Sequence, residues 1–78
     1  MVSLNHKYSE GDRIWFVDED VNGAYPEYGE IVAFRKNGDM VISFYAGMAL
    51  MYKKQIFPTK EECEKHIYIS KLAKEIKK

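Results

Sequence analysis

The side chains that could do chemistry in this sequence are one cysteine, two histidines and a group of acids. Cys63 and His66 lie three residues apart, a spacing that brings two side chains to one face of a helix. A zinc site takes four ligands, and the sequence has no second cysteine to add to this pair. A nucleophilic Cys-His pair needs a third, orienting group, and none accompanies these two residues on their helix. We therefore expect no catalytic residue, no metal site and no cofactor.

The acids include a partial match to a calcium-binding loop. Asp18, Asp20, Asn22 and Gly23 fit its first six positions, where alternate oxygen side chains converge on the ion. The match fails at position twelve, which is Gly29 instead of a glutamate. We interpret the segment as an acidic turn between two strands.

Aromatic side chains are the more informative feature, because rings bury area at a low entropic cost and stack on proline, cations or bases. Alternation along a strand at residues 13–17 places Ile14 and Phe16 toward the core and leaves Trp15, with Tyr45, on the opposite face. Two tyrosines lie in or beside the acidic loop. The predicted partner-binding residues are Trp15, Asp18, Glu19, Asp20, Tyr25 and Tyr28.

Charge is balanced in total and uneven in order. Twelve basic residues cancel twelve acidic ones, which excludes a uniformly basic DNA-coating protein. Residues 9–30 hold seven acids against Arg13, a net charge of −6, and residues 31–60 hold five bases against Asp39, a net charge of +4. The acidic part suits a basic groove on a protein. The alternative is weak nucleic-acid binding through Arg35, Lys36, Lys53 and Lys54.

These residues need elements to position them, and 78 residues make one domain. Runs of β-branched and aromatic residues predict strands at 13–17, 28–34, 40–45 and 49–53, with a short extended piece at 55–57. Asn37-Gly38 predicts a tight hairpin turn between two of them. Pro26 disfavours a central strand, so a long loop is expected over residues 18–27.

The last quarter of the sequence predicts a helix over residues 59–78, opened by a capping box in which Thr59 caps the Glu62 N–H. Its apolar residues fall on two stripes, one with Cys63, Ile67 and Ser70 and the other with Ile69, Leu72, Ala73 and Ile76. One straight helix cannot bury both stripes on a small sheet. Either the helix bends after about Tyr68, or the second stripe meets the sheet edge, a partner or another copy. The candidate dimer stripe is Ile69, Leu72 and Ile76.

Several short motifs carry a resemblance. They are Gly11-Asp12 before the first strand, Gly29-Glu30-Ile31-Val32, and the segment from Ile56 to Cys63 closing on Ile67. Over roughly residues 9–68 the chain resembles small uncharacterised bacterial and phage proteins in which a Gly-Asp strand opens an SH3-like barrel. The resemblance implies a mainly β fold, a small SH3-like antiparallel barrel of four or five strands with a C-terminal α-helix, and a mobile-element origin.

The domain plan is then a loose arm at 1–8, a barrel at 9–58 and a helix at 59–78. A single cysteine forms no internal disulfide, and neither a signal peptide nor a membrane-spanning run is apparent, so we expect a cytoplasmic protein. We expect no enzyme, but a module that binds another protein, such as an anti-CRISPR-like inhibitor of a host nuclease or defence complex. Its oligomeric state is open between monomer and homodimer.

Overall fold

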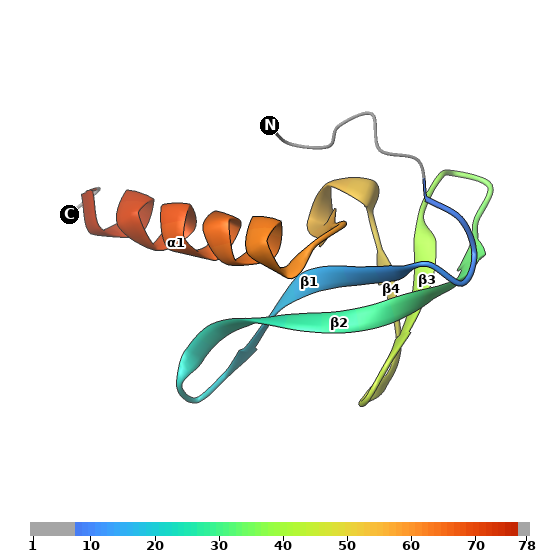
Figure 1. Ribbon diagram of the computed structural model, residues 1–78, viewed down its shortest axis with the longest axis horizontal. Coiled ribbons are helices and arrows are strands. Elements are labelled where there is room, and N and C mark those ends of the chain that lie inside the picture. Colours follow the sequence, from blue (N-terminus) through green and yellow to red (C-terminus); the bar gives the residue numbers. More distant parts are fainter. Residues whose placement is uncertain (1–7, 77–78) are drawn as a thin grey trace.

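The computed structural model describes the backbone of residues 8–76 and the side chains of residues 8–74. Five antiparallel strands form one sheet in the order β4-β3-β2-β1-β5, followed by a single helix (Figure 1). The elements are β1 (Arg13–Asp20), β2 (Gly23–Phe34), β3 (Met40–Phe44), β4 (Gly47–Met51), the 3₁₀ turn η1 (Lys53–Gln55), β5 (Ile56–Phe57) and α1 (Lys60–Ile76). The expected mainly β fold with a C-terminal helix is confirmed. β4 and β5 are the edges, so hydrogen bonding does not close the sheet into a barrel.

The segment after the first strand is a hairpin, and the expected long loop over residues 18–27 is wrong. β1 continues to Asp20 and β2 begins at Gly23, whose φ of 116° suits glycine at the turn. Pro26 lies within β2, opposite Val17. It is tolerated because β3 pairs with β2 only from Glu30 onward, so this stretch of β2 is an edge. β1 and β2 thus form a two-stranded ribbon that extends beyond the rest of the sheet (Figure 1).

The Gly-Asp motif fastens the start of the chain to β2. The Gly11 N–H donates to the Ile31 carbonyl at 2.7 Å, and the Ile31 N–H donates to the Asp12 carbonyl at 3.0 Å. The Asp12 carboxylate also accepts from the Ser9 N–H at 2.8 Å. Tyr8 packs against the core, whereas the rest of the predicted loose arm, residues 1–7, lies outside the described residues.

Side chains on one face of the curled sheet form the core, and we call this the inner face. The alternation predicted for residues 13–17 is confirmed, because Ile14 and Phe16 are buried there together with Ile31, Met40, Ile42 and Ile56. Gly29 makes the curl possible. A Cβ at this position would lie 2.6 Å from Ile42 Cγ2 and 2.8 Å from the Ser43 carbonyl oxygen, so β2 and β3 approach too closely for any side chain.

The β2–β3 connection is the tight turn that Asn37-Gly38 predicts. Gly38 adopts a φ of 92°, and its N–H donates to the Arg35 carbonyl at 3.0 Å. Asp39 is buried, and its carboxylate accepts from Asn37 Nδ2 at 3.1 Å. The buried acid is therefore hydrogen-bonded within its own turn.

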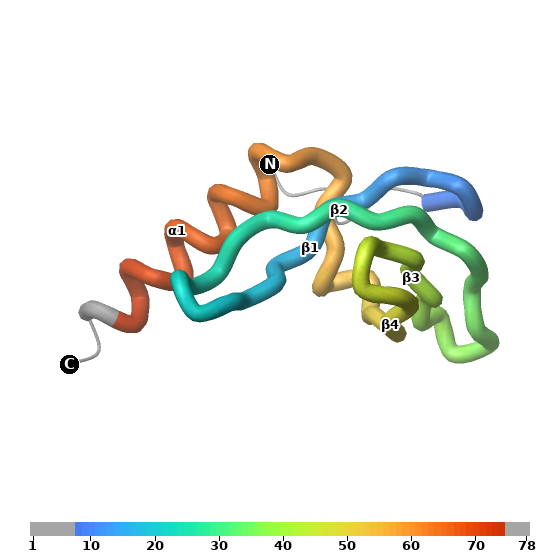
Figure 2. Tube along the Cα trace, turned by 90° about the horizontal axis from the view of Figure 1, so that it is seen from below, coloured from blue at the N-terminus to red at the C-terminus, as the bar shows by residue number. Residues whose placement is uncertain are grey.

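The helix begins where its cap predicts, with Thr59 Oγ1 accepting from the Glu62 N–H at 3.2 Å. α1 lies against the opposite side of the β1–β2 ribbon from the core, which we call the outer face, and runs alongside the ribbon away from β3 and β4 (Figure 2). The contact is made by the first predicted stripe, since Cys63 is fully buried and Ile67 and Ser70 are partly buried.

The described residues of the second stripe are exposed. α1 is a single straight helix from Lys60 to Ile76, without a bend after Tyr68, and its last turns pass beyond the ribbon (Figure 1). Ile69 is 53% exposed and Leu72 is 39% exposed. The side chain of Ile76, the third member of the predicted dimer stripe, lies outside the described part. Within residues 8–76 no helix is long and apolar enough to cross a membrane.

Candidate functional site

The six predicted partner-binding residues lie on the β1–β2 ribbon and divide between its two faces. Because Ile14 and Phe16 point inward, alternation sends Trp15 and Glu19 to the outer face, and the register places Tyr28 beside Trp15. The other three point to the inner side, beyond the end of the core, and they are Asp18, Asp20 and Tyr25. One flat patch of all six therefore does not form.

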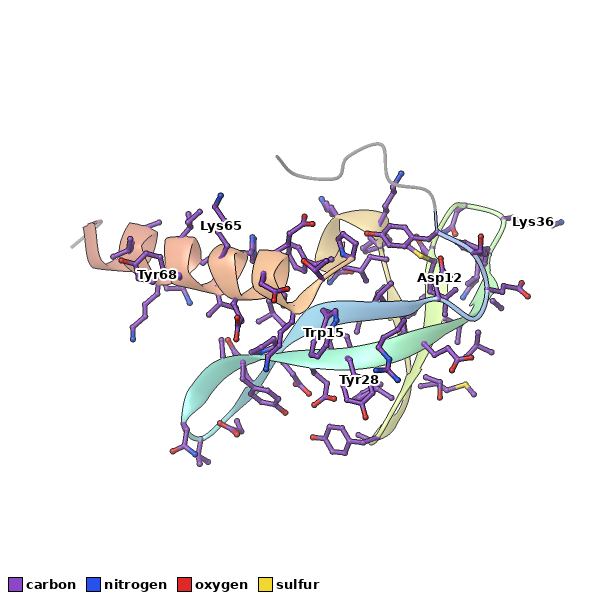
Figure 3. The ribbon with its side chains drawn as sticks, viewed as in Figure 1. Asp12, Trp15, Tyr28, Lys36, Lys65 and Tyr68 are labelled. Carbon is purple, nitrogen blue, oxygen red and sulfur yellow. The ribbon has the colours of Figure 1, made fainter. Side chains whose placement is uncertain are left out.

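An aromatic pair crosses the strands on the outer face. Trp15 and Tyr28 lie beside each other on neighbouring strands (Figure 3), with their ring centroids 5.5 Å apart. A cation lies over each ring. The Arg13 guanidinium carbon lies 4.8 Å from the centre of the Tyr28 ring, and Lys60 Nζ lies 5.9 Å from the centre of the Trp15 ring. Tyr28 is 49% exposed. The pair thus presents π faces that already attract positive charge.

Next to Tyr28, at the edge that β2 presents beyond the end of β3, lies a groove of about 260 Å³, which we call the Tyr28 groove. It is lined from both faces of the sheet, because Glu27 lies opposite the inward-pointing Phe16 and the Phe44 ring packs against that of Phe16. It lies near Glu30, where β2 stops pairing with β1 and begins to pair with β3, beside the β3–β4 turn. Its chemistry is mixed, with two carboxylates, three aromatic rings and one guanidinium. These side chains belong to Arg13, Glu27, Tyr28, Glu30, Phe44 and Tyr45.

Tyr45 connects this groove to the inner side of the ribbon. It was expected on the face of Trp15, but it lies in the β3–β4 turn, where strand alternation no longer applies. Its ring packs edge-on against that of Phe44, with the ring centroids 5.6 Å apart, and its hydroxyl acts on the pKa of Tyr25. The Tyr25 hydroxyl donates to Asp18 Oδ2 at 3.2 Å. The hydroxyl of Tyr45, followed by burial and the Asp18 charge, raises the pKa of Tyr25 well above its ordinary value.

The acids at the end of the ribbon bind their own backbone. Asp18 Oδ1 accepts from the Glu19 N–H and Asp20 Oδ1 accepts from the Asn22 N–H, both at 2.8 Å. The residues that partly match a calcium loop therefore form the end of β1 and the turn that follows it. This agrees with their interpretation as an acidic turn. Among residues 8–74 no group of three or more His, Cys, Asp or Glu side chains could hold a metal ion.

Cys63 and His66 lie in different environments, one buried and the other exposed. Burial, with a smaller contribution from the Glu64 charge, raises the pKa of the Cys63 thiol to about 11. The thiol is therefore protonated at neutral pH, and a protonated thiol is a poor nucleophile. His66 is exposed and its ring lies 5.2 Å from that of Phe57. The pair covers the outer face of the ribbon.

The four candidate nucleic-acid contacts lie at the opposite end of β3 and β4 from Tyr45. Arg35 and Lys36 belong to the β2–β3 turn, Lys53 and Lys54 belong to η1, and both connections flank the paired Met40 and Met51. All four basic side chains are exposed, and Lys36 points away from the fold at its far end (Figure 3). The sheet therefore has an acidic, aromatic end and a basic end.

Sequence reasoning missed Glu27, Glu30 and Tyr45 as members of a site. Both glutamates were counted in the acidic segment, but only the strand register places Glu30 opposite Arg13 and next to Ser43 of β3. Comparison of the chain with protein-family models, with curated proteins and with solved structures gave no match. The site is therefore argued from its own geometry.

Proposed function

We propose that the protein is a non-enzymatic binding module that presents its β1–β2 hairpin to a basic surface of another protein. One observation carries the proposal. Residues 13–34 hold five carboxylates and a single basic side chain, together with the exposed Tyr28 ring beside Trp15. Clustered negative charge steers association with a positive surface, and rigid aromatic side chains supply contact area.

We further propose that the sheet is an SH3-like barrel left open between its edges. Three features support it: the meander order β4-β3-β2-β1-β5, a 3₁₀ turn between β4 and β5, and a long β2 that curls at Gly29. The resemblance of residues 9–68 to small bacterial and phage proteins supports a mobile-element origin. A protein that covers the basic nucleic-acid groove of a host nuclease is the role that fits both the origin and the charge.

The experiment uses Trp15, the only tryptophan of the chain, as a fluorescent reporter at the surface concerned. The full-length protein is titrated with a peptide of Lys-Gly repeats at low and at physiological salt. The double variant Glu19→Gln/Asp20→Asn removes two charges while keeping an acceptor for the Asn22 N–H. Its matched control, Glu61→Gln/Glu64→Gln, removes two exposed charges from α1.

We expect the hairpin variant to weaken binding about three- to ten-fold, as loss of close charge pairs does, and the α1 variant to weaken it less than two-fold. Equal weakening by both variants, or no binding at low salt, overturns the proposal. A DNA oligonucleotide serves as the opposing probe. Tight DNA binding that falls steeply with salt and is lost in Arg35→Gln/Lys36→Gln would support nucleic-acid binding instead.

A further inference from the structure

The Tyr28 groove already holds one guanidinium, that of the chain itself. Arg13 lies over the Tyr28 ring at 4.8 Å and stands opposite Glu30 in the neighbouring strand. A guanidinium is flat, weakly hydrated and delocalised, so it stacks on aromatic faces and pairs with carboxylates along its edge. The internal contact therefore shows which chemistry this surface accepts.

We propose that the Tyr28 groove is the site that receives an arginine side chain of the partner. This inference rests on the proposed function and names the chemical group that its acidic surface selects. The groove offers the Glu27 and Glu30 carboxylates to the charged end, and the rings of Phe44 and Tyr45 to the methylene stem. Its volume of about 260 Å³ admits one long side chain.

The groove is held in shape before a ligand arrives. Glu27 Oε2 accepts from the Tyr28 N–H at 3.2 Å, which fixes one carboxylate at the rim. Tyr45 is 75% exposed, yet its ring packs edge-on against that of Phe44, with the ring centroids 5.6 Å apart. Side chains that need not be ordered on binding spare the complex that entropic cost.

Arginine is favoured over lysine for two reasons. Two carboxylates and a ring face suit a planar fork of donors, whereas the ammonium of lysine is a compact and strongly hydrated point charge. The exposed Tyr28 ring is also already in contact with a guanidinium in the free protein. In the complex the partner's guanidinium takes that face and Arg13 turns toward solvent, so Arg13 acts as an internal competitor.

The test compares three short peptides that differ only at one central residue flanked by glycines: arginine, lysine or the neutral analogue citrulline. Binding to the full chain is followed by Trp15 fluorescence, because the Trp15 ring lies 5.5 Å from that of Tyr28. We expect the arginine peptide to bind at least about three-fold more tightly than the lysine peptide, and the citrulline peptide to lose most of the binding. Equal binding of arginine and lysine peptides contradicts the proposal.

Variants then separate the groove from the general acidic surface. Glu27→Gln/Glu30→Gln should abolish the preference for arginine, while Glu19→Gln/Asp20→Asn should weaken all charged peptides alike. Arg13→Gln should strengthen binding of the arginine peptide about three-fold more than Lys36→Gln, a matched loss of one exposed positive charge far from the groove. Far-ultraviolet circular dichroism confirms that each variant is folded.

The outcomes distinguish the two proposals. If Glu19→Gln/Asp20→Asn weakens binding and Glu27→Gln/Glu30→Gln does not, the hairpin remains the binding surface and the arginine groove is wrong. If Arg13→Gln weakens binding of the arginine peptide, Arg13 belongs to the binding surface and the competitor role is wrong. If no peptide binds, both proposals fail.

Discussion

The outer face of the sheet is covered over one half and bare over the other. Over β5 and the β1–β2 ribbon beyond Tyr28 it is covered by α1, where Cys63 is fully buried and Phe57 contacts His66. Over β3 and β4 the same side of the sheet carries Met48 and Leu50, which are 68% and 49% exposed. Strand alternation by itself points the outer side chains of both halves toward solvent in the same way. What distinguishes them is the route of the helix after β5.

The difference separates stabilisation from recognition. The covered half gains stability from apolar area removed from water, about 25 cal/mol per Å². The Tyr28 groove lies between the two halves, with Arg13 and Tyr28 on the strands near the helix, Phe44 at the end of β3 and Tyr45 in the β3–β4 turn. It is therefore a part of the surface where aromatic and charged side chains remain accessible while their strands are held by the core.

The strongest way to break this comparison is to place the same charge on each half. Cys63→Asp buries a carboxylate at a fully buried position and should cost more than about 3 kcal/mol, whereas Leu50→Asp on the bare half should cost less than about 0.5 kcal/mol. Urea unfolding followed by Trp15 fluorescence measures both. If Cys63→Asp does not fold, Cys63→Ser supplies the value, expected at about 1–3 kcal/mol. Equal costs for the two positions would mean that α1 does not protect its half.

The junction of the two halves is the next test. Gly29→Ala places a methyl group 2.6 Å from Ile42 Cγ2 and 2.8 Å from a backbone oxygen, so the curl of β2 must open. We expect a loss of about 1–3 kcal/mol in the free energy of unfolding, typical of overpacking. Ser43→Ala, on the same part of β3 but facing outward, is the control and should be close to neutral. A neutral Gly29→Ala would show that the two halves are not tightly joined there.

How far the sequence predicts this molecule depends on how local each signal is. Ile14 and Phe16 point inward as alternation requires, Asn37-Gly38 makes its turn, and Thr59 caps the helix. These features depend on a few neighbouring residues. The ribbon was missed because Pro26 signals a loop when nothing shows that this stretch of β2 is an edge.

The candidate site depends on register, which is why less of it could be predicted. The pairing of Trp15 with Tyr28 follows only once the hairpin turn is known to be at residues 21–22. Tyr45 reaches Tyr25 through the curl of the sheet, a contact between residues that are distant in the sequence. Composition indicated an acidic, aromatic surface, but it could not say which rings and carboxylates share a groove.

Alkaline pH provides a graded way to sharpen the comparison. Burial raises the pKa of Cys63 to about 11, above its value in the unfolded chain. The neutral thiol therefore contributes its full stability below about pH 9, and this contribution is lost as the pH rises toward 11. The loss should reach about 1 kcal/mol at pH 10. Tyrosines also titrate here, so the measured quantity is the difference between the native chain and Cys63→Ala. A difference that does not change with pH would mean that the thiol is accessible to water in the folded protein.

The smallest expected effect is at the start of the helix. Thr59→Ala removes the acceptor of the Glu62 N–H and should cost about 0.5–1 kcal/mol, while Thr59→Ser should restore most of the loss. Because α1 covers only the β1–β2–β5 half, amide hydrogen exchange should accelerate in α1 and leave β3 and β4 unchanged. Uniform acceleration would show that the covered and bare halves unfold as one unit, in which case the helix contributes to the whole sheet and not only to the face that it covers.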